Sequence, residues 1–147
     1  MKCRFAALLG MLVFTIIAVA ALAPARADGV SSGDKSTMQA IVSDQIAAFA
    51  HDDASAAYGF ASPAIQSQFN NPDAFMAMVK NGYGPIYRPR SVTFGALAET
   101  DAGPVQTVYV TGADGESFVA LYTFQKQPDG SWKINGVRIV KDDSPTI

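Results

Sequence analysis

Apolar and polar residues follow two different periods along the chain. From Ser36 to Phe49 the apolar positions recur at spacings of three and four, which predicts an amphipathic helix with Ser36 as its N-cap. From Ser91 onward the spacing becomes two, which is typical of β-strands. Helices followed by antiparallel strands predict an α+β fold, with the N-terminal helices packed on a curved antiparallel sheet of about four strands.

Three shorter helices are expected between these two halves, because residues that favour helix starts recur there. The expected starts are Asp53 before 54–60, Ser62 with Pro63 before 64–69, and Asn71 with Pro72 before a helix that Gly82 ends. Prolines at 85 and 89 argue against a helix in the next stretch. Residues 83–90 are therefore expected to form an extended connector.

The strands are expected at 91–98, 105–111, 117–127 and 132–140. The first should place Val92, Phe94 and Ala96 on one face. The third is apolar on both faces, which predicts a place in the middle of the sheet. Asn135 and the glycine after it indicate a bulge in the last strand.

The N-terminal 27 residues have the composition of a secretory signal peptide. A basic start is followed by an apolar run and by Ala25-Arg26-Ala27. An uncleaved membrane anchor is the competing interpretation, because the apolar run is close to the ~20 residues needed to span a bilayer. We favour cleavage, which predicts a periplasmic or secreted protein with no membrane segment after processing. The expected organisation is a signal peptide at 1–27, a flexible leader at 28–35, one α+β domain at 36–141 and a polar tail at 142–147.

Cleavage would change the composition that matters for function. The single cysteine, Cys3, would be lost, so that neither a disulfide nor a thiolate metal site could form. Loss of Lys2, Arg4 and Arg26 would leave 8 basic against 13 acidic residues, a formal charge of −5. An acidic domain without a basic cluster argues against nucleic acid as a partner.

Several segments of the chain resemble an uncharacterised proteobacterial family that is catalogued only as a domain of unknown function. The resemblance rests on segments 60–66, 69–90, 121–132 and 134–136, within about residues 37–140. The expected order of helices and strands in the chain is also loosely similar to the cone-shaped α+β folds of nuclear transport factor 2, ketosteroid isomerase and the polyketide cyclases. The resemblance implies helices closed over a curved sheet around a pocket, and it implies no particular activity, because that group contains both enzymes and binding modules.

The histidine that stands beside two carboxylates, in His51-Asp52-Asp53, is the first candidate for chemistry. Adjacent side chains at a helix end diverge, so a helix end followed by an N-cap is the simpler interpretation. No metal site, cofactor or catalytic residue is predicted. If the domain is nevertheless a cone-fold isomerase, lyase or cyclase, Asp53 and Asp73 are the first residues to suspect as its acid or base.

The connector offers a candidate anion site. In an extended chain Arg88 and Arg90 would project to the same side, with Tyr87 beside them. Two guanidinium groups could hold an anionic ligand or a partner's carboxylate. Pairing with acidic residues of the same fold is the alternative.

Aromatic and apolar side chains of the helical half could line a small pocket, although they could equally be simple core. These residues are Tyr58, Phe60, Phe69, Phe75, Met78, Tyr83 and Tyr122. The sequence does not determine a function. Our preferred hypothesis is an exported, non-catalytic binding or accessory module for a small apolar or anionic ligand. A cone-fold enzyme and a homodimer that uses its sheet as an interaction face are the alternatives.

Overall fold

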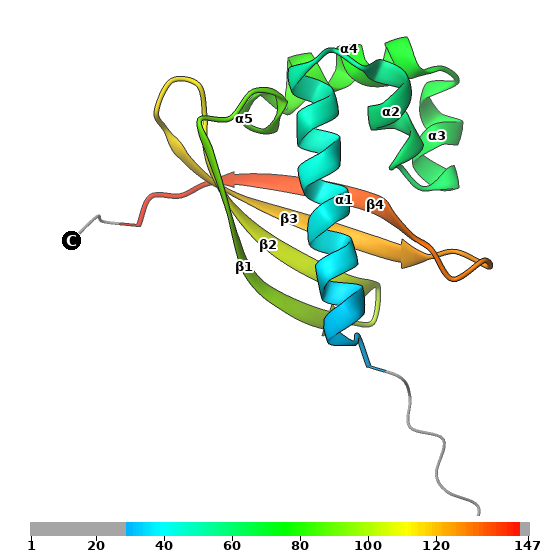
Figure 1. Cartoon of the computed structure of the whole chain (residues 1–147). Coiled ribbons are helices and arrows are strands. Elements are labelled where there is room, and N and C mark those ends of the chain that lie inside the picture. The colour runs from blue at the N-terminus through cyan, green and yellow to red at the C-terminus, as the bar shows by residue number, and fades with distance from the viewer. Residues whose placement is uncertain (1–28, 145–147) are drawn as a thin grey trace, which may run out of the picture.

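The computed structural model describes residues 29–144, and the proposed signal peptide lies outside this range. Within it, five helices precede an antiparallel sheet of four strands, which confirms the α+β class (Figure 1). The helices are α1 (Ser32–Ala50), α2 (Ala54–Gly59), α3 (Pro63–Phe69), α4 (Pro72–Gly82) and α5 (Gly84–Tyr87). The strands are β1 (Ser91–Thr100), β2 (Gly103–Thr111), β3 (Ser117–Lys126) and β4 (Trp132–Lys141).

The sheet is a simple meander in which each strand pairs with the next, in the order β1-β2-β3-β4. Strand β3 lies between β2 and β4, as its two apolar faces predicted. Its residues Ala120, Tyr122 and Phe124 are buried on the helix-covered face. The described strands do not close into a barrel, so β1 and β4 are edges.

Two irregularities change which side chains share a face. In β4, Asn135 is the extra residue between the pairs Phe124–Ile134 and Thr123–Gly136, which confirms the expected bulge. A second bulge lies in β1 between Phe94 and Leu97. It makes the predicted face of β1 wrong, because Leu97 rather than Ala96 continues the face of Phe94.

Gly95 lies within the β1 bulge, between Phe94 and Leu97. A Cβ at this position would lie 2.7 Å from the ring of Tyr109 on β2. The ring therefore occupies the space that any larger residue would need. Alternation of apolar residues alone could not reveal this close approach, because it is a contact between two strands.

Helix α1 begins earlier than the apolar pattern suggested. Ser31, not Ser36, is the N-cap, and it forms a capping box with Asp34. Residues 32–35 of the expected flexible leader are therefore helical. The Trp132 indole donates a hydrogen bond of 2.9 Å to Asp34, which fastens this helix end to β4.

The connector at 83–90 is not wholly extended, which corrects the prediction from its prolines. Gly84–Tyr87 forms the short helix α5, with Pro85 near its start, where proline removes no hydrogen bond. This turn buries Ile86, which is 2 % exposed.

Helix α1 crosses one face of the sheet, and the shorter helices gather near its C-terminal end (Figure 1). The core between the layers contains Met38, Val42 and Phe49 of α1, each 0–1 % exposed. No described helix covers the other face, which carries the exposed Tyr109 and Val140. None of the helices within residues 29–144 is long and apolar enough to cross a membrane.

Candidate functional site

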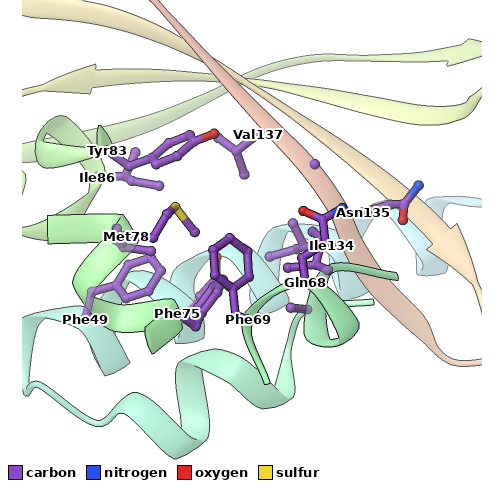
Figure 2. Close-up of a pocket in the computed structure, with 15 residues that line it drawn as sticks. Phe49, Gln68, Phe69, Phe75, Met78, Tyr83, Ile86, Ile134, Asn135 and Val137 are labelled. Carbon is purple, nitrogen blue, oxygen red and sulfur yellow. The ribbon is translucent and has the colours of Figure 1, made fainter. Parts of the chain in front are cut away.

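A cavity of about 360 Å³ lies where the second half of α1, the short helices and β4 meet (Figure 2). Binding pockets for small molecules typically occupy roughly 300–1,000 Å³ and are mostly apolar. This one is walled mainly by aromatic and aliphatic side chains, among them Phe49, Phe69, Phe75, Met78, Ile86 and Val137. The space is therefore a candidate site for a small apolar ligand.

A cluster of aromatic rings around Phe75 forms one wall of the cavity. The Phe75 ring centroid lies 6.3 Å from that of Phe49, 5.8 Å from that of Phe69 and 5.7 Å from that of Tyr58. Edge-on and tilted contacts at such distances add to the stabilisation from burial alone. The rings that line the cavity thus come from α1, α3 and α4, and Tyr58 of α2 packs behind them.

The start of α3 is fastened to β4, which holds the opposite side of the cavity. The Ser62 amide donates to the Ile134 carbonyl at 2.8 Å, and the Ile134 amide donates to the Phe60 carbonyl at 2.9 Å. The Ser62 hydroxyl donates to the Asn135 amide oxygen at 2.8 Å and also caps α3. Ser62 is fully buried, so water does not reach its own groups in these bonds.

The polar side chains among the lining residues are neutral: Gln45, Gln68, Tyr83 and Asn135. In Figure 2 the Tyr83 hydroxyl points toward Val137, whereas the Asn135 amide points away from the cavity. The described lining contains no Asp, Glu, His, Lys or Arg. Its chemistry is that of hydrogen-bonding amides and a phenol in an apolar surround.

Among the residues that the sequence suggested for a pocket or an anion site, four line this cavity: Phe69, Phe75, Met78 and Tyr83. Tyr58 lies behind the aromatic wall, where its hydroxyl donates to the Gln66 carbonyl at 2.8 Å. The Gln66 amide in turn donates to the Tyr58 carbonyl at 2.9 Å. The structure thus gives Tyr58 a role in joining α2 to α3.

Tyr122 lies beside the cavity rather than in its lining. It pairs across the sheet with Val137, which does line the cavity. Its hydroxyl is fully buried and has no hydrogen-bond partner among the described residues. Burial raises the pKa of Tyr122 well above its usual value, so the phenol stays neutral.

Tyr87 and Arg88 belong to a different group of side chains, centred on Asp52. The Asp52 carboxylate accepts hydrogen bonds from the Tyr87 hydroxyl and from Arg88 at 2.8 Å, and Lys80 lies 3.2 Å away. These bonds, led by the one from Tyr87, lower the pKa of Asp52 below its usual 3.8. Asp52 thus joins the α1–α2 turn to α4 and α5.

The side chains around Asp52 include one of the two arginines of the predicted anion site. Arg88 is paired with Asp52, whereas the backbone amide of Arg90 donates to Thr111 at 2.8 Å and its side chain extends toward Gly115. The two guanidinium groups thus have different surroundings. A ligand-binding role for them stays a prediction, and for Arg88 such a ligand would compete with Asp52.

The residue pattern placed Asp52 only at a helix end and did not single out Gln45. Asp52 has a φ of 54°, a left-handed conformation that Asp tolerates better than most residues. A polar residue on the apolar stripe was the available signal for Gln45, which is 2 % exposed. Asp53 caps α2 as expected, and His51 is exposed at the end of α1.

The residues 29–144 contain no cluster of three His, Cys, Asp or Glu side chains that could hold a metal ion. The catalytic suspects also lie outside the cavity lining. Asp53 accepts a bond from the Ala56 amide at 3.1 Å, and Asp73 is exposed in the first turn of α4. Neither carboxylate is placed to act on a molecule in the cavity.

The fold and the site define an α+β domain with a neutral, mainly apolar cavity between its helices and its sheet. The chain belongs to the family described as Domain of unknown function (DUF4864), whose model matches residues 31–147. Neither a curated protein nor a solved structure matches the chain. The function is therefore undetermined by comparison.

Proposed function

We propose that this protein is an exported module that binds a small, neutral, mainly apolar molecule in the cavity and does not transform it. The cavity of about 360 Å³ with its aromatic wall carries the proposal. Burying an apolar ligand there would gain roughly 25 cal/mol for each Å² removed from water. Because the wall is built from rigid rings already packed on one another, little ordering would oppose binding.

The chemistry of the lining supports binding over catalysis. General acid–base catalysis requires a group that exchanges protons near neutral pH, most often a histidine or a carboxylate. The described lining offers amides and the Tyr83 phenol instead. In a cone-fold enzyme the acid or base would have to lie in the cavity, and neither Asp53 nor Asp73 lies in its lining.

Export is the second part of the proposal and rests on the sequence of residues 1–27. We propose cleavage before Asp28 and a periplasmic or secreted location. We further propose a bacterial origin among the proteobacteria and kinship with nuclear transport factor 2-like cone folds. The position of the helices on one face of the sheet, with a cavity beneath them, supports the kinship.

A homodimer remains the second candidate, favoured by one feature of the sheet. Tyr109 is 48 % exposed and Val140 is 38 % exposed, both on the face that no described helix covers. Both residues neighbour Val119 on this face, and contiguous exposed apolar residues can mark a surface that binds another protein. Ligand binding and dimer formation would use opposite faces of the sheet and are compatible.

The proposal is tested by filling the cavity. Val137 lines it, whereas the neighbouring Arg138 is exposed on the other face of β4. We expect Val137→Trp to abolish binding of N-phenyl-1-naphthylamine, a neutral apolar dye whose fluorescence rises in apolar sites. Arg138→Trp, the matched control on the same strand, should bind the dye as the wild-type protein does.

Two results would count against the proposal. The wild-type protein could fail to bind the dye, or the two variants could bind it equally well. Because an added indole can overpack a core and destabilise it by about 1–3 kcal/mol, circular dichroism should accompany the titrations. Val137→Phe provides a smaller insertion if the tryptophan variant does not fold.

A further inference from the structure

We propose that Gln45 selects the ligand by accepting a hydrogen bond from a neutral donor group, a hydroxyl or an amide N–H, through its side-chain carbonyl oxygen. The inference rests on the proposed binding function and specifies the class of molecule that the cavity takes. It predicts an alcohol, a phenol or an amide on an apolar body, and it predicts rejection of the corresponding carboxylate.

The orientation of the Gln45 amide is fixed by its partner. Its Nε2 atom donates to the backbone carbonyl of Ala57 at 3.2 Å. A carbonyl can only accept, so the nitrogen must be the atom that faces Ala57. The Gln45 oxygen is consequently directed elsewhere.

The Gln45 oxygen has no hydrogen-bond partner of its own within the described part of the chain. The one fully enclosed side-chain polar atom without a partner there is the hydroxyl of Tyr122. The Gln45 oxygen must therefore reach space that a solvent molecule can enter. Since Gln45 is only 2 % exposed and lines the cavity, that space is the cavity.

A buried carbonyl oxygen with an open lone pair binds donors and repels acceptors. A hydroxyl or an N–H placed against it would replace a bond to water, whereas a ligand without a donor would leave the oxygen unpaired. A carboxylate has only acceptor oxygens when ionised, and it would also lose its hydration in an apolar space.

The charges near the cavity give a carboxylate no compensation. No Lys or Arg belongs to the described lining. Around the nearby helices, Lys80 and Arg88 are paired with Asp52, and the Lys133 ammonium donates to the Gly59 carbonyl at 2.6 Å. The site therefore favours neutral ligands over anions. Of the apolar or anionic ligands expected from the sequence, this leaves the apolar ones.

Three probes with the same ring system separate these possibilities. Naphthalene has no polar group, 1-naphthol adds a neutral donor, and 1-naphthoate adds a carboxylate. Measured by equilibrium dialysis at neutral pH, 1-naphthol should bind about two- to tenfold more tightly than naphthalene, the range expected for one net hydrogen bond. Binding of 1-naphthoate should be weaker than that of either.

The Gln45→Leu variant tests whether Gln45 causes the preference for 1-naphthol over naphthalene. The Ala57 carbonyl still accepts a bond from the Phe60 amide, at 3.3 Å, so the substitution leaves it paired. Naphthalene should bind this variant at least as well as it binds the wild-type protein, while the preference for 1-naphthol should disappear. Gln68→Leu removes the exposed amide of the same lining and tests the competing assignment, in which Gln68 provides the acceptor.

The outcomes distinguish this inference from the proposed function. Equal binding of naphthalene and 1-naphthol, a preference for 1-naphthoate, or loss of the preference in Gln68→Leu instead of Gln45→Leu would overturn the role of Gln45 while leaving the cavity as a binding site. Failure of all three probes to bind would overturn both. The comparison in the wild-type protein is decisive even if Gln45→Leu proves unstable.

Discussion

At the scale of single residues, the buried polar side chains differ in how many of their polar atoms have a hydrogen-bond partner within the fold. Gln106 is fully buried and its amide donates to the carbonyls of Gly95 and Thr107, which holds the β1 bulge. Ser62 likewise has its bonding capacity used within the fold. Gln45 differs because only its nitrogen is engaged. The apolar stripe placed Gln45 toward the core, but the sequence could not show which of its atoms is paired, because the partner Ala57 is reached only through tertiary packing.

Asp34 provides a prediction at this scale. Hydrogen bonds from Trp132 and then from Ser31 lower the pKa of Asp34 from 3.8 to about 2. A carboxyl whose pKa is lower in the folded state stabilises the protein above its unfolded pKa and loses that contribution as the pH falls through the folded value. The stabilisation from Asp34 should therefore be complete above pH 3.8 and should fade toward about pH 2.

The measurement is urea denaturation of the wild-type protein and Asp34→Asn at about pH 5 and about pH 2.5. We expect the wild-type protein to be the more stable at the higher pH and the difference to shrink at the lower one. Asp44→Asn, on an exposed part of the same helix, is the control. A difference between wild type and Asp34→Asn that stays constant with pH would contradict the assignment.

At the scale of secondary structure, the short helices were predictable from their first residues. The N-caps Asp53, Ser62 and Asn71 all lie where the sequence placed them. Two elements were mispredicted for physical reasons. Ser31 and Asp34 satisfy the first turn of α1 through side chains, so that helix needs no apolar residue at its start. Pro85 argues against a helix by its type alone, but proline is tolerated in the first turn, and burial of Ile86 stabilises this short helix against the core.

Ser62 tests whether the start of α3 stabilises the fold. Its buried hydroxyl caps α3 and donates to Asn135, so Ser62→Ala removes two interactions at once. Loss of a cap and of a buried hydrogen bond should lower the free energy of unfolding by about 1–3 kcal/mol. Urea denaturation measures this change.

Ser67→Ala is the matched control, because the exposed hydroxyl of Ser67 bonds only to the Ala64 carbonyl of its own helix. We expect that variant to stay within about 0.5 kcal/mol of the wild-type protein. Equal loss of stability in the two variants would show that the bond between Ser62 and Asn135 does not hold α3 to β4.

At the scale of the whole molecule, the cavity follows from how the two layers meet. Helix α1 packs closely on the sheet, whereas α3, α4 and α5 surround its C-terminal end and leave a space against β4. The sequence predicted the two layers and some of the aromatic residues, such as Phe69 and Phe75. It could not distinguish a pocket from a filled core, because that depends on how short helices of similar composition are oriented.

Native mass spectrometry of the protein isolated from the cells that produce it, before and after denaturation, tests the central claim most directly. We predict a chain that begins at Asp28 and carries a neutral organic molecule with a hydroxyl or an amide, which is released on denaturation and is absent from Val137→Trp. The same spectrum reports the oligomeric state. A chain that binds no molecule, whether isolated from cells or after incubation with the apolar probes, would contradict a ligand-binding function for the cavity.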